Sequence, residues 1–595
     1  MPDIPWLFQE AQRHHRAGRL NEAEQAYRQI LAREPRQAHA LHSFGVLASQ
    51  TGNFDTAVEL IGRAIAVQGE VAIYHNSLGV ALYRQRKFDD ALASADRAVA
   101  IRPGYADAFY TRGNILNRLQ RPAEAAASYE RALAIDPNHR YALNALANRA
   151  LRICDWARTT KLKGVLERHV AEGKAVVTPF NFLGYSSDAA LQLKCAKSYA
   201  QTILPVRPPA MWHDEQYRHR RIRLAYLAGD FHSHANPALE LFERHDRTRF
   251  EVIGVSFGPD GNSDIRARAS RSFDQFHDVR LRNDHDIAAL LKQLEIDIAI
   301  DMTGYTNGTR CGILAHRPVP IQVNLLVYPG TLGVDFMDYI VGDKIVVPFD
   351  RQPFYMERIV QLPDCFQAND STREISSLTP RRQEVGLPEQ GFVFCSFTNS
   401  YKITPPVFAA WMWLLKSIAG SVLWLLHDNA AATANLRRQA AALGIEPSRL
   451  VFAPRLPPEQ HLARHRLADL FLDTLPVNAG GSASDALWAG LPLLTCSGDS
   501  AVSRLGASQL NAIGLPVVTK SLDEYATLAR KLATNPVLLR SIRRRLKANR
   551  LTHPLFDGDR YRRHLEAAYA RMWEIWQRGE KPRSFAVPPY DRVKS

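Results

Sequence analysis

Downstream of Arg221, short runs of β-branched and aromatic residues alternate with longer segments of helical hydrophobic spacing. Such runs are typical of buried strands, and their alternation with helices predicts parallel sheets covered by helices. The predicted strands form two sets, separated by a loop near residues 379–391: 222–227, 250–256, 296–301 and 321–326, then 392–397, 422–426, 450–452, 470–472 and 493–495. Two doubly wound α/β halves of this kind leave a cleft, and ligands bind there at the carboxyl ends of the strands.

The first 140 residues carry an internal repeat instead. When the chain is shifted against itself by 34 residues, small residues recur in register. The recurring positions are Gly45, Gly79 and Gly113, then Ala23, Ala57, Ala91 and Ala125, then Ala64, Ala98 and Ala132, and finally Pro35, Pro103 and Pro137. This pattern is typical of tetratricopeptide repeats, in which two antiparallel helices approach closely at small residues. About four units over residues 5–140 predict a superhelix whose concave face binds a peptide or a partner protein.

Between the repeat and the α/β region, prolines interrupt the helical pattern: Pro179, Pro205, Pro208 and Pro209. Proline-rich segments of this kind often separate domains. We therefore expect a divergent helical cap and linker over residues 141–215. The first α/β half is predicted over residues 216–378 and the second over residues 386–580.

A stretch of small residues follows the predicted strand at 470–472. Gly480, Gly481 and Ser482 lie where this strand leads into a helix that we expect to begin near Ser482. Backbone N–H groups at the positive end of a helix dipole form a seat for a phosphate or diphosphate. Asp485, one turn further on, would lie where a ribose presents its hydroxyls. The alternative is an ordinary strand–loop–helix corner, because short motif matches are weakly specific.

Composition and charge narrow the function classes. The chain has 595 residues, with 46% hydrophobic and 23% charged residues, as in globular proteins of about three or four domains. The net charge of +15 suits an acidic ligand such as a nucleotide diphosphate, an acidic partner or nucleic acid. We expect no nucleic acid, because the basic residues are scattered apart from residues 543–545.

Other sequence features bear on location. No stretch is long and apolar enough to span a bilayer, and the first residues lack a signal-peptide pattern. The six cysteines lie far apart without a C-x-x-C pair, so neither a disulfide framework nor a zinc site is expected. These features predict a cytoplasmic protein.

Several motifs occur together in a fixed order. They are YLAGDFHSH at 226–234, DMTGYT at 301–306, RPVPIQ at 317–322, YPGT at 328–331, CSFTNSYKI at 395–403, SVLWLL at 421–426, His461, LAD at 467–469, DALWAG at 485–490 and HPLF at 553–556. With the repeats before them, the chain resembles the protein O-linked N-acetylglucosamine transferase family, including its SPINDLY-like members. The resemblance implies a GT-B fold of two Rossmann-like halves. It also implies an inverting, metal-independent transfer of a sugar from a nucleotide diphosphate to Ser or Thr of a protein.

The resemblance assigns roles in the second half. It implies that Lys402 contacts the diphosphate, that His461 and Arg464 lie near the nucleotide base, and that Asp485 holds the ribose. A fixed cation such as Lys402 would stabilise negative charge on the departing phosphate. The alternatives are a surface lysine after a strand for Lys402 and a helix-cap neighbour for His461. Asn399 stands where the animal enzyme has a glutamine that touches the nucleotide.

In the first half, the resemblance implies that His234 lies beside the acceptor and the sugar. His232 is the competing histidine. A histidine in a loop facing the cleft can accept a proton near neutral pH. Asp301 either orients one of these imidazoles or caps the turn at Gly304. The residues Pro329, Gly330 and Thr331 are expected in a tight turn against the sugar or diphosphate; the alternative is a plain type II turn, which Pro-Gly favours.

No metal or other cofactor is expected beyond the nucleotide-sugar substrate. Two D-x-D matches, at residues 284–286 and 557–559, have a spacing that metal-dependent glycosyltransferases use. Both fall where a loop leads into a helix, and aspartate is a frequent helix cap. We therefore interpret both as structural.

Departures from the family leave three readings open. Gly480, Gly481 and Ser482 stand where relatives carry His-Thr-Thr or a threonine-rich run, while Val327 replaces a glycine and Leu325 a tryptophan. The first reading is a protein O-glycosyltransferase. Its donor would be UDP-N-acetylglucosamine, or GDP-fucose as in plant SPINDLY-like members. The repeats would present the acceptor and could also form a homodimer. The second is a glycosyltransferase with another acceptor. The third is a repeat scaffold whose transferase half has decayed.

Overall fold

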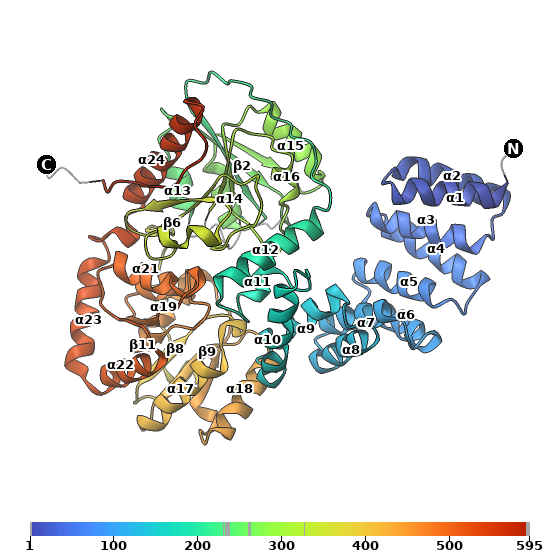
Figure 1. Cartoon of the computed structure of the whole chain (residues 1–595). Helices are drawn as coiled ribbons and strands as arrows, with labels where there is room; N and C mark the ends of the chain where they lie inside the picture. Colours follow the sequence, from blue (N-terminus) through green and yellow to red (C-terminus); the bar gives the residue numbers. More distant parts are fainter. Residues whose placement is uncertain (1–2, 230, 232–237, 260–262, 326–327, 591–595) are drawn as a thin grey trace. The chain divides into compact units, whose positions relative to one another are not determined.

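The computed structural model describes residues 3–229, 231, 238–259, 263–325 and 328–590 (Figure 1). By their internal contacts these residues divide into two compact units, Met1–Ala150 and Leu151–Ser595. The smaller unit is helical, and the larger contains both predicted parallel sheets. The predicted fold class is therefore confirmed.

The smaller unit is a series of helical hairpins. Its helices are α1 (Ile4–Arg16), α2 (Leu20–Arg33), α3 (Ala38–Gln50), α4 (Phe54–Val67), α5 (Ala72–Arg84), α6 (Phe88–Ile101), α7 (Ala106–Arg118), α8 (Pro122–Ile135) and α9 (Arg140–Arg152), the last crossing into the larger unit. Each odd-numbered helix from α1 to α7 contacts the helix that follows it. This is the paired arrangement expected of the repeat.

The repeated glycines lie where the paired helices touch. A Cβ atom on Gly45 would lie 2.6 Å from Ile61, and one on Gly113 would lie 2.4 Å from the ring of Tyr129. A Cβ on Gly79 would lie 3.2 Å from the carbonyl oxygen of Ala91. Close helix approach therefore explains why the sequence pattern places glycine at these positions.

The larger unit begins with the helices α10 (Trp156–Ala171), α11 (Pro179–Phe182) and α12 (Ala189–Ile203). The indole nitrogen of Trp156 donates to the carbonyl oxygen of Ile403 at 3.1 Å, and the Cys154 thiol donates to that of Ser400. This part of the predicted cap and linker thus packs on the second α/β half. The sequence pattern showed helix and proline spacing but not which surface these helices cover.

The first sheet has eight strands in the order β14-β7-β6-β5-β4-β1-β2-β3, with every paired strand parallel. Its strands are β1 (Ile222–Ala228), β2 (Phe250–Ser256), β3 (Gln275–Asp278), β4 (Ile298–Asp301), β5 (Ile321–Asn324), β6 (Tyr339–Asp343), β7 (Arg358–Leu362) and β14 (Phe585–Ala586). Its helices are α13 (Leu239–Arg244), α14 (Asp264–Arg271), α15 (Asp284–Gln293), α16 (Gly312–Ala315) and α24 (Gly558–Gln577). Apart from its outer strands, this is the doubly wound order of dinucleotide-binding folds.

The second sheet repeats that winding in the order β10-β9-β8-β11-β12-β13, again parallel throughout. Its strands are β8 (Val393–Ser396), β9 (Val422–Leu426), β10 (Leu450–Ala453), β11 (Leu470–Leu472), β12 (Leu493–Cys496) and β13 (Val518–Thr519). Its helices are α17 (Pro405–Ser417), α18 (Ala430–Ala442), α19 (Pro458–Arg464), α20 (Gly481–Trp488), α21 (Leu505–Ala512), α22 (Leu522–Thr534) and α23 (Pro536–Asn549).

Burial of both sheet faces explains the apolar runs of the sequence. In β1, Leu224 and Tyr226 belong to one buried cluster, while Ala225 and Leu227 belong to another on the opposite face. Successive side chains of a strand point to opposite faces, so a strand covered on both sides must be apolar throughout.

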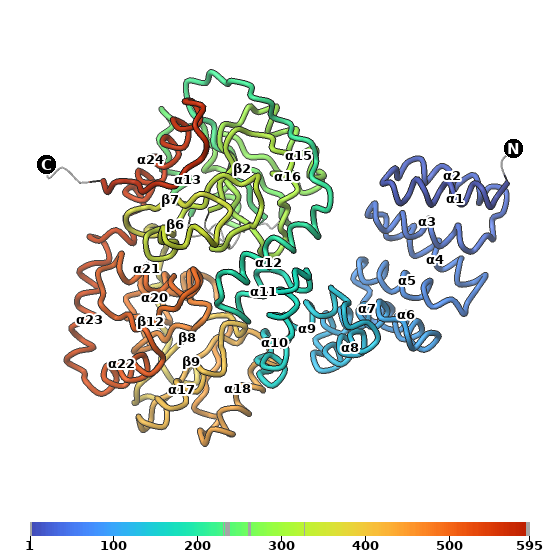
Figure 2. Tube along the Cα trace, viewed as in Figure 1, coloured from blue at the N-terminus to red at the C-terminus, as the bar shows by residue number. Residues whose placement is uncertain are grey.

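The last long helix returns to the first sheet. In Figures 1 and 2, α24, drawn in red, lies beside α13 and the green strands of the first half. Its Tyr569 hydroxyl lies 3.3 Å from that of Tyr226 in β1, and Leu565 and Met572 share the core of that half. The predicted second half, 386–580, therefore does not describe where this helix packs. None of the described helices is both long and apolar enough to cross a membrane.

Candidate active site

The loop between β11 and α20 is held by two buried side chains. The Asp473 carboxylate accepts from the amides of Thr474 and Ala479 at 2.8 and 2.7 Å, and from the Thr495 hydroxyl at 2.6 Å. Burial raises the pKa of Asp473 to about 6, although these hydrogen bonds and Lys402 oppose the shift. The amide of the buried Asn478 donates to the carbonyl oxygen of Thr474 at 2.6 Å. The loop backbone is thereby fixed ahead of the helix.

Helix α20 begins where the sequence predicts. Gly480 is its N-cap, Gly481 is exposed, and no atom lies within 4 Å of a Cβ built on Gly481. The first amides of a helix have no intrahelical acceptor and lie at the positive end of its dipole. The Ser482 hydroxyl donates to the carbonyl oxygen of Phe397 at 3.0 Å, which joins the helix start to the end of β8.

Lys402 lies against the same loop. It ends a short 3₁₀ helix, Ser400–Lys402, after β8, and its Nζ donates to the carbonyl oxygen of Asn478 at 2.8 Å. The side chain is half-buried. One fixed cation and the first turn of α20 therefore converge on one loop, which is an arrangement suited to a diphosphate.

His461, Arg464 and Asp485 form a second cluster beside this loop. The Arg464 guanidinium donates to Nδ1 of His461 and, at 2.6 Å, to the carbonyl oxygen of Pro454. Because Nδ1 accepts this bond, the neutral His461 ring carries its proton on Nε2, which lies 3.7 Å from the Asp485 carboxylate. Burial, with help from His465 and Arg464, lowers the pKa of His461 to about 2. This imidazole is therefore a neutral hydrogen-bonding group.

Asp485 also binds a residue that the sequence analysis did not identify. The Arg373 guanidinium donates to the Asp485 carboxylate at 2.6 Å and to the Ser484 hydroxyl at 3.1 Å. Arg373 lies in the segment that crosses from β7 to β8, and the Trp488 indole donates to its carbonyl oxygen at 3.0 Å. Burial raises the pKa of Asp485, whereas Arg373 opposes that shift.

Asn399 lies at the edge of this region. Its side-chain oxygen accepts from the Arg455 guanidinium at 3.1 Å, and Arg455 also pairs with Asp428 at 3.0 Å. Arg455 is exposed, so this contact lies on the solvent side of the cluster.

In the first half, the predicted YPGT turn is hydrogen-bonded to the buried side chain of Glu357. The Thr331 hydroxyl donates to the Glu357 carboxylate at 2.6 Å, and the carbonyl oxygen of Gly330 accepts from the Asn324 side chain at 3.0 Å. Gly330 lacks the positive φ that a type II turn needs after Pro329, so that alternative is wrong.

Asp301, at the carboxyl end of β4, is buried. Its carboxylate accepts from the amides of Thr303 and Gly304 at 2.7 and 3.1 Å, the turn-capping geometry considered for it. Burial raises its pKa, and these two bonds oppose the shift. His232 and His234 lie outside the described residues, so their role as a base stays a prediction.

The two D-x-D motifs make structural contacts. Asp284 binds Arg310 at 2.7 Å, Asp557 caps α24, and Asp559 pairs with Arg563 at 2.8 Å. Within the part of the chain that the structure describes, no three His, Cys, Asp or Glu residues cluster as metal ligands would.

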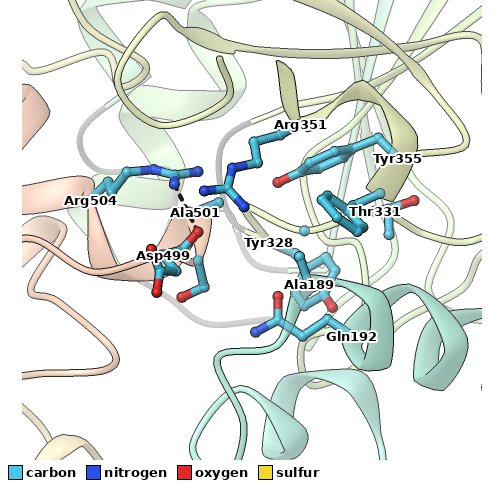
Figure 3. Close-up of a pocket in the computed structure, with 12 residues that line it drawn as sticks. Ala189, Gln192, Tyr328, Thr331, Arg351, Tyr355, Asp499, Ala501 and Arg504 are labelled. Carbon is cyan, nitrogen blue, oxygen red and sulfur yellow. Dashed lines mark hydrogen bonds between the residues drawn. The ribbon is translucent and has the colours of Figure 1, made fainter. Parts of the chain in front are cut away.

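A small pocket lies between the halves (Figure 3). Two of the predicted sugar-site residues, Gly330 and Thr331, line it together with Tyr328. Pro329 lies between Tyr328 and Gly330 in sequence. The second half contributes residues just after β12, including Ala501 and Arg504. Lys402, α20 and the His461 cluster do not line this pocket.

Two repeated Rossmann-like windings in one compact unit are the arrangement of the GT-B fold. The model described as Glycosyl transferase family 41 matches residues 153–381 and 368–565, and a tetratricopeptide-repeat model matches residues 42–106 and 84–140. The chain belongs to glycosyl transferase family 41.

Individual relatives agree with this assignment. A probable UDP-N-acetylglucosamine–peptide N-acetylglucosaminyltransferase, SEC, of Arabidopsis thaliana is 32% identical over 459 residues, 73% of this chain and 47% of that protein. The corresponding transferase of Caenorhabditis elegans is 25% identical over 558 residues, 72% of this chain and 48% of that protein. The chain therefore spans about half the length of the curated relatives it matches.

A solved structure covers more of both chains. An O-GlcNAc transferase mutant of Thermobaculum terrenum is 25% identical, with a TM-score of 0.67 over 91% of this chain and 98% of that chain. The predicted resemblance to O-GlcNAc transferases and SPINDLY-like proteins is confirmed.

Proposed function

We propose that this protein transfers N-acetylglucosamine from UDP-N-acetylglucosamine to Ser or Thr side chains of a protein acceptor. The observation that carries the proposal is the position of Lys402, whose Nζ donates to the Asn478 carbonyl oxygen in the loop that leads into the first turn of α20. The names of the similar transferases support the donor and the acceptor class. The presence of Lys402, His461 and Asp485 favours an active transferase over a decayed scaffold, whereas the changed phosphate loop at residues 480–482 favours decay.

In the proposed reaction the acceptor hydroxyl attacks the anomeric carbon on the face opposite the diphosphate. A new C–O bond forms while the bond to the diphosphate breaks, and the configuration at that carbon inverts. UDP leaves with the electron pair, and the hydroxyl proton passes to a base. Lys402 and the α20 amides stabilise the charge that develops on the diphosphate, in place of a metal ion. His234 is our candidate base.

The nucleoside is assigned to the cluster beside that loop. The ribose hydroxyls would bind Asp485, whose orientation Arg373 fixes, while His461 and Arg464 lie near the base. Because His461 is neutral and carries its proton on Nε2, it can donate to a carbonyl oxygen of a pyrimidine without a charge change.

The repeats are assigned to the acceptor. Helical repeats of this type bind extended peptides or partner proteins on their concave face. We further propose a cytoplasmic protein that forms a homodimer through the repeats, which light scattering of full-length and repeat-deleted chains would test.

The decisive experiment is calorimetric titration with UDP and, separately, GDP, followed by an assay of sugar transfer. We expect UDP to bind, and Lys402→Ala to weaken binding about 10- to 100-fold, because a charge-assisted hydrogen bond contributes about 1.5–3 kcal/mol. Lys416→Ala is the matched control, since Lys416 is an exposed lysine of α17 in the same half.

Other outcomes identify the other readings. Binding of GDP but not UDP would assign a guanosine-linked donor such as GDP-fucose. Binding of neither nucleotide would leave the repeat scaffold as the function. UDP binding that Lys402→Ala and Lys416→Ala affect equally would contradict the role given to Lys402.

A further inference from the structure

The pocket between the halves contains two arginine side chains that the proposed transfer does not use. Arg351 comes from the 3₁₀ helix Phe349–Phe354, and Arg504 follows the 3₁₀ helix Ala501–Ser503. Figure 3 shows both side chains extending toward one another along the pocket wall. Two cationic side chains are therefore close together.

Arg504 is fixed by neutral acceptors. It is 9% exposed, and its guanidinium donates to the carbonyl oxygens of Asp499 at 2.8 Å and Val346 at 2.7 Å. Its Nε atom is buried without a partner. Burial lowers the pKa of Arg504, and Arg351 lowers it further. Its charge is thus held in place without a carboxylate in contact.

The guanidinium of Arg351 has fewer hydrogen-bond partners than that of Arg504. Among the described residues, no hydrogen-bond acceptor or ion-pair partner contacts its guanidinium, and its Nε atom is buried without a partner. The side chain is only half-buried, so the rest of its planar fork is available to the pocket.

No carboxylate among the described residues lies within ion-pair distance of either arginine. Asp350 and Asp499 are exposed and act on Arg504 only at longer range, although Asp499 also lines the pocket. Glu357, which is buried nearby, is occupied by Thr331 and Leu332. Partly buried cations without a counter-charge are costly, and the cost falls when an anion binds between them.

We propose that the pocket between Arg351 and Arg504 is a second binding site, specific for an oxyanion. The ligand class is a carboxylate or a phosphate group, received by the arginine forks and by polar groups of the wall such as Tyr355 and Gln192. Neither Lys402 nor α20 lines this site, although Gly330 and Thr331, which are predicted to lie against the sugar or diphosphate, do. The site is therefore a neighbour of the proposed diphosphate seat. The inference does not depend on the identity of the donor.

The test is titration of the full chain with inorganic phosphate and, separately, acetate, both in the presence of saturating UDP. UDP is expected to occupy the Lys402 loop, so the anion reports on the second site. We expect one equivalent of anion to bind to the wild type, and Arg351→Gln to weaken that binding at least tenfold while UDP affinity stays within about twofold. Preference for phosphate indicates a phosphorylated or free phosphate ligand, and preference for acetate indicates an acidic side chain of an acceptor.

Two further variants keep the result interpretable. Arg358→Gln removes an exposed arginine of β7 outside the pocket lining and should leave anion binding unchanged. At Arg504 the substitution is Arg504→Lys, which keeps the positive charge in case a neutral side chain there disturbs folding. Absence of anion binding, or equal binding to Arg351→Gln and Arg358→Gln, would overturn the proposal. If UDP does not bind, anion binding is measured without UDP in the Lys402→Ala background, again with Arg351→Gln and Arg358→Gln. Failure of the transferase proposal is then distinguished from failure of the anion-site proposal.

Discussion

The environment of His461 limits what this residue can do. Arg464 donates to one ring nitrogen, the ring of His465 lies 4.9 Å away edge-on, and burial disfavours a second proton. Because the pKa of His461 lies far below its ordinary value of 6.5, the ring is neutral near neutral pH. It therefore cannot act as a charged proton donor there. It acts as a fixed hydrogen-bonding group.

This environment makes stability depend on pH. Below pH 6.5 an unfolded His461 binds a proton that the folded one, with a pKa of about 2, does not. Stability must therefore fall as the pH falls, by about 2 kcal/mol between pH 6.5 and 5 from this group alone. Denaturant unfolding of His461→Gln should show a shallower pH slope than the wild type, whereas substitution of the exposed His427 by Gln should not. Identical slopes would contradict the assigned neutral state.

Arg373 is a positioning residue for Asp485. We expect Arg373→Ala to weaken UDP binding about tenfold, because the carboxylate loses its fixed orientation. In a double-mutant cycle, Arg373→Ala should add little to Asp485→Ala if it acts through that carboxylate. Arg381→Ala removes an exposed arginine of the same crossing and is the control. Additive losses from Arg373→Ala and Asp485→Ala would refute this role.

At this scale the sequence indicated residues that lie in one continuous motif, such as Gly480, Ser482 and Asp485. It did not indicate Arg373, which is 112 residues away from Asp485, or the way Asp473 fixes the loop. Contacts between distant segments depend on how the elements pack, and one sequence carries no signal for them.

At the level of single elements, the paired helices of the repeats can approach closely because glycine, which has no side chain, lies at their contact. Gly113→Ala would place a Cβ 2.4 Å from the Tyr129 ring, and we expect a loss of about 1–3 kcal/mol. Gly62→Ala, in α4 with open space around its Cβ, is the matched control and should stabilise by up to about 1 kcal/mol. Thermal unfolding followed by circular dichroism measures both, and equal effects of the two changes would argue against close packing as the reason for Gly113.

The nine predicted strands are all present, whereas β3, β6, β7, β13 and β14 were not predicted. Strand β3 is polar and partly exposed, β6 ends in Gly342-Asp343, and β13 and β14 have two residues each. Hydrophobic runs identify strands that are buried on both faces. The edge strands β3, β13 and β14 are defined by their neighbours, which the local pattern does not contain. Strands β6 and β7 are interior and buried, but their apolar runs are short and are interrupted by Gly342 and Gln361.

At the scale of the whole molecule, the C-terminal helix completes the first half. Met572→Ala should remove about 2–5 kcal/mol, because Met572 is fully buried in the core of that half. Amide hydrogen exchange should accelerate in β1 and β2 before it does in β8 and β9. Glu574→Ala, on the exposed side of the same helix, should change neither. Faster exchange in β8 alone would mean that α24 stabilises the other half.

The return of α24 also restricts how the halves can move. From β1 onward the chain crosses between them twice, once between β7 and β8 and once between α23 and α24. A body joined to another by two segments has fewer relative motions open to it than a body joined by one. Any opening of the cleft for a nucleotide is therefore limited by the length of both crossings at once, and shortening either of them would reduce how far the halves can separate.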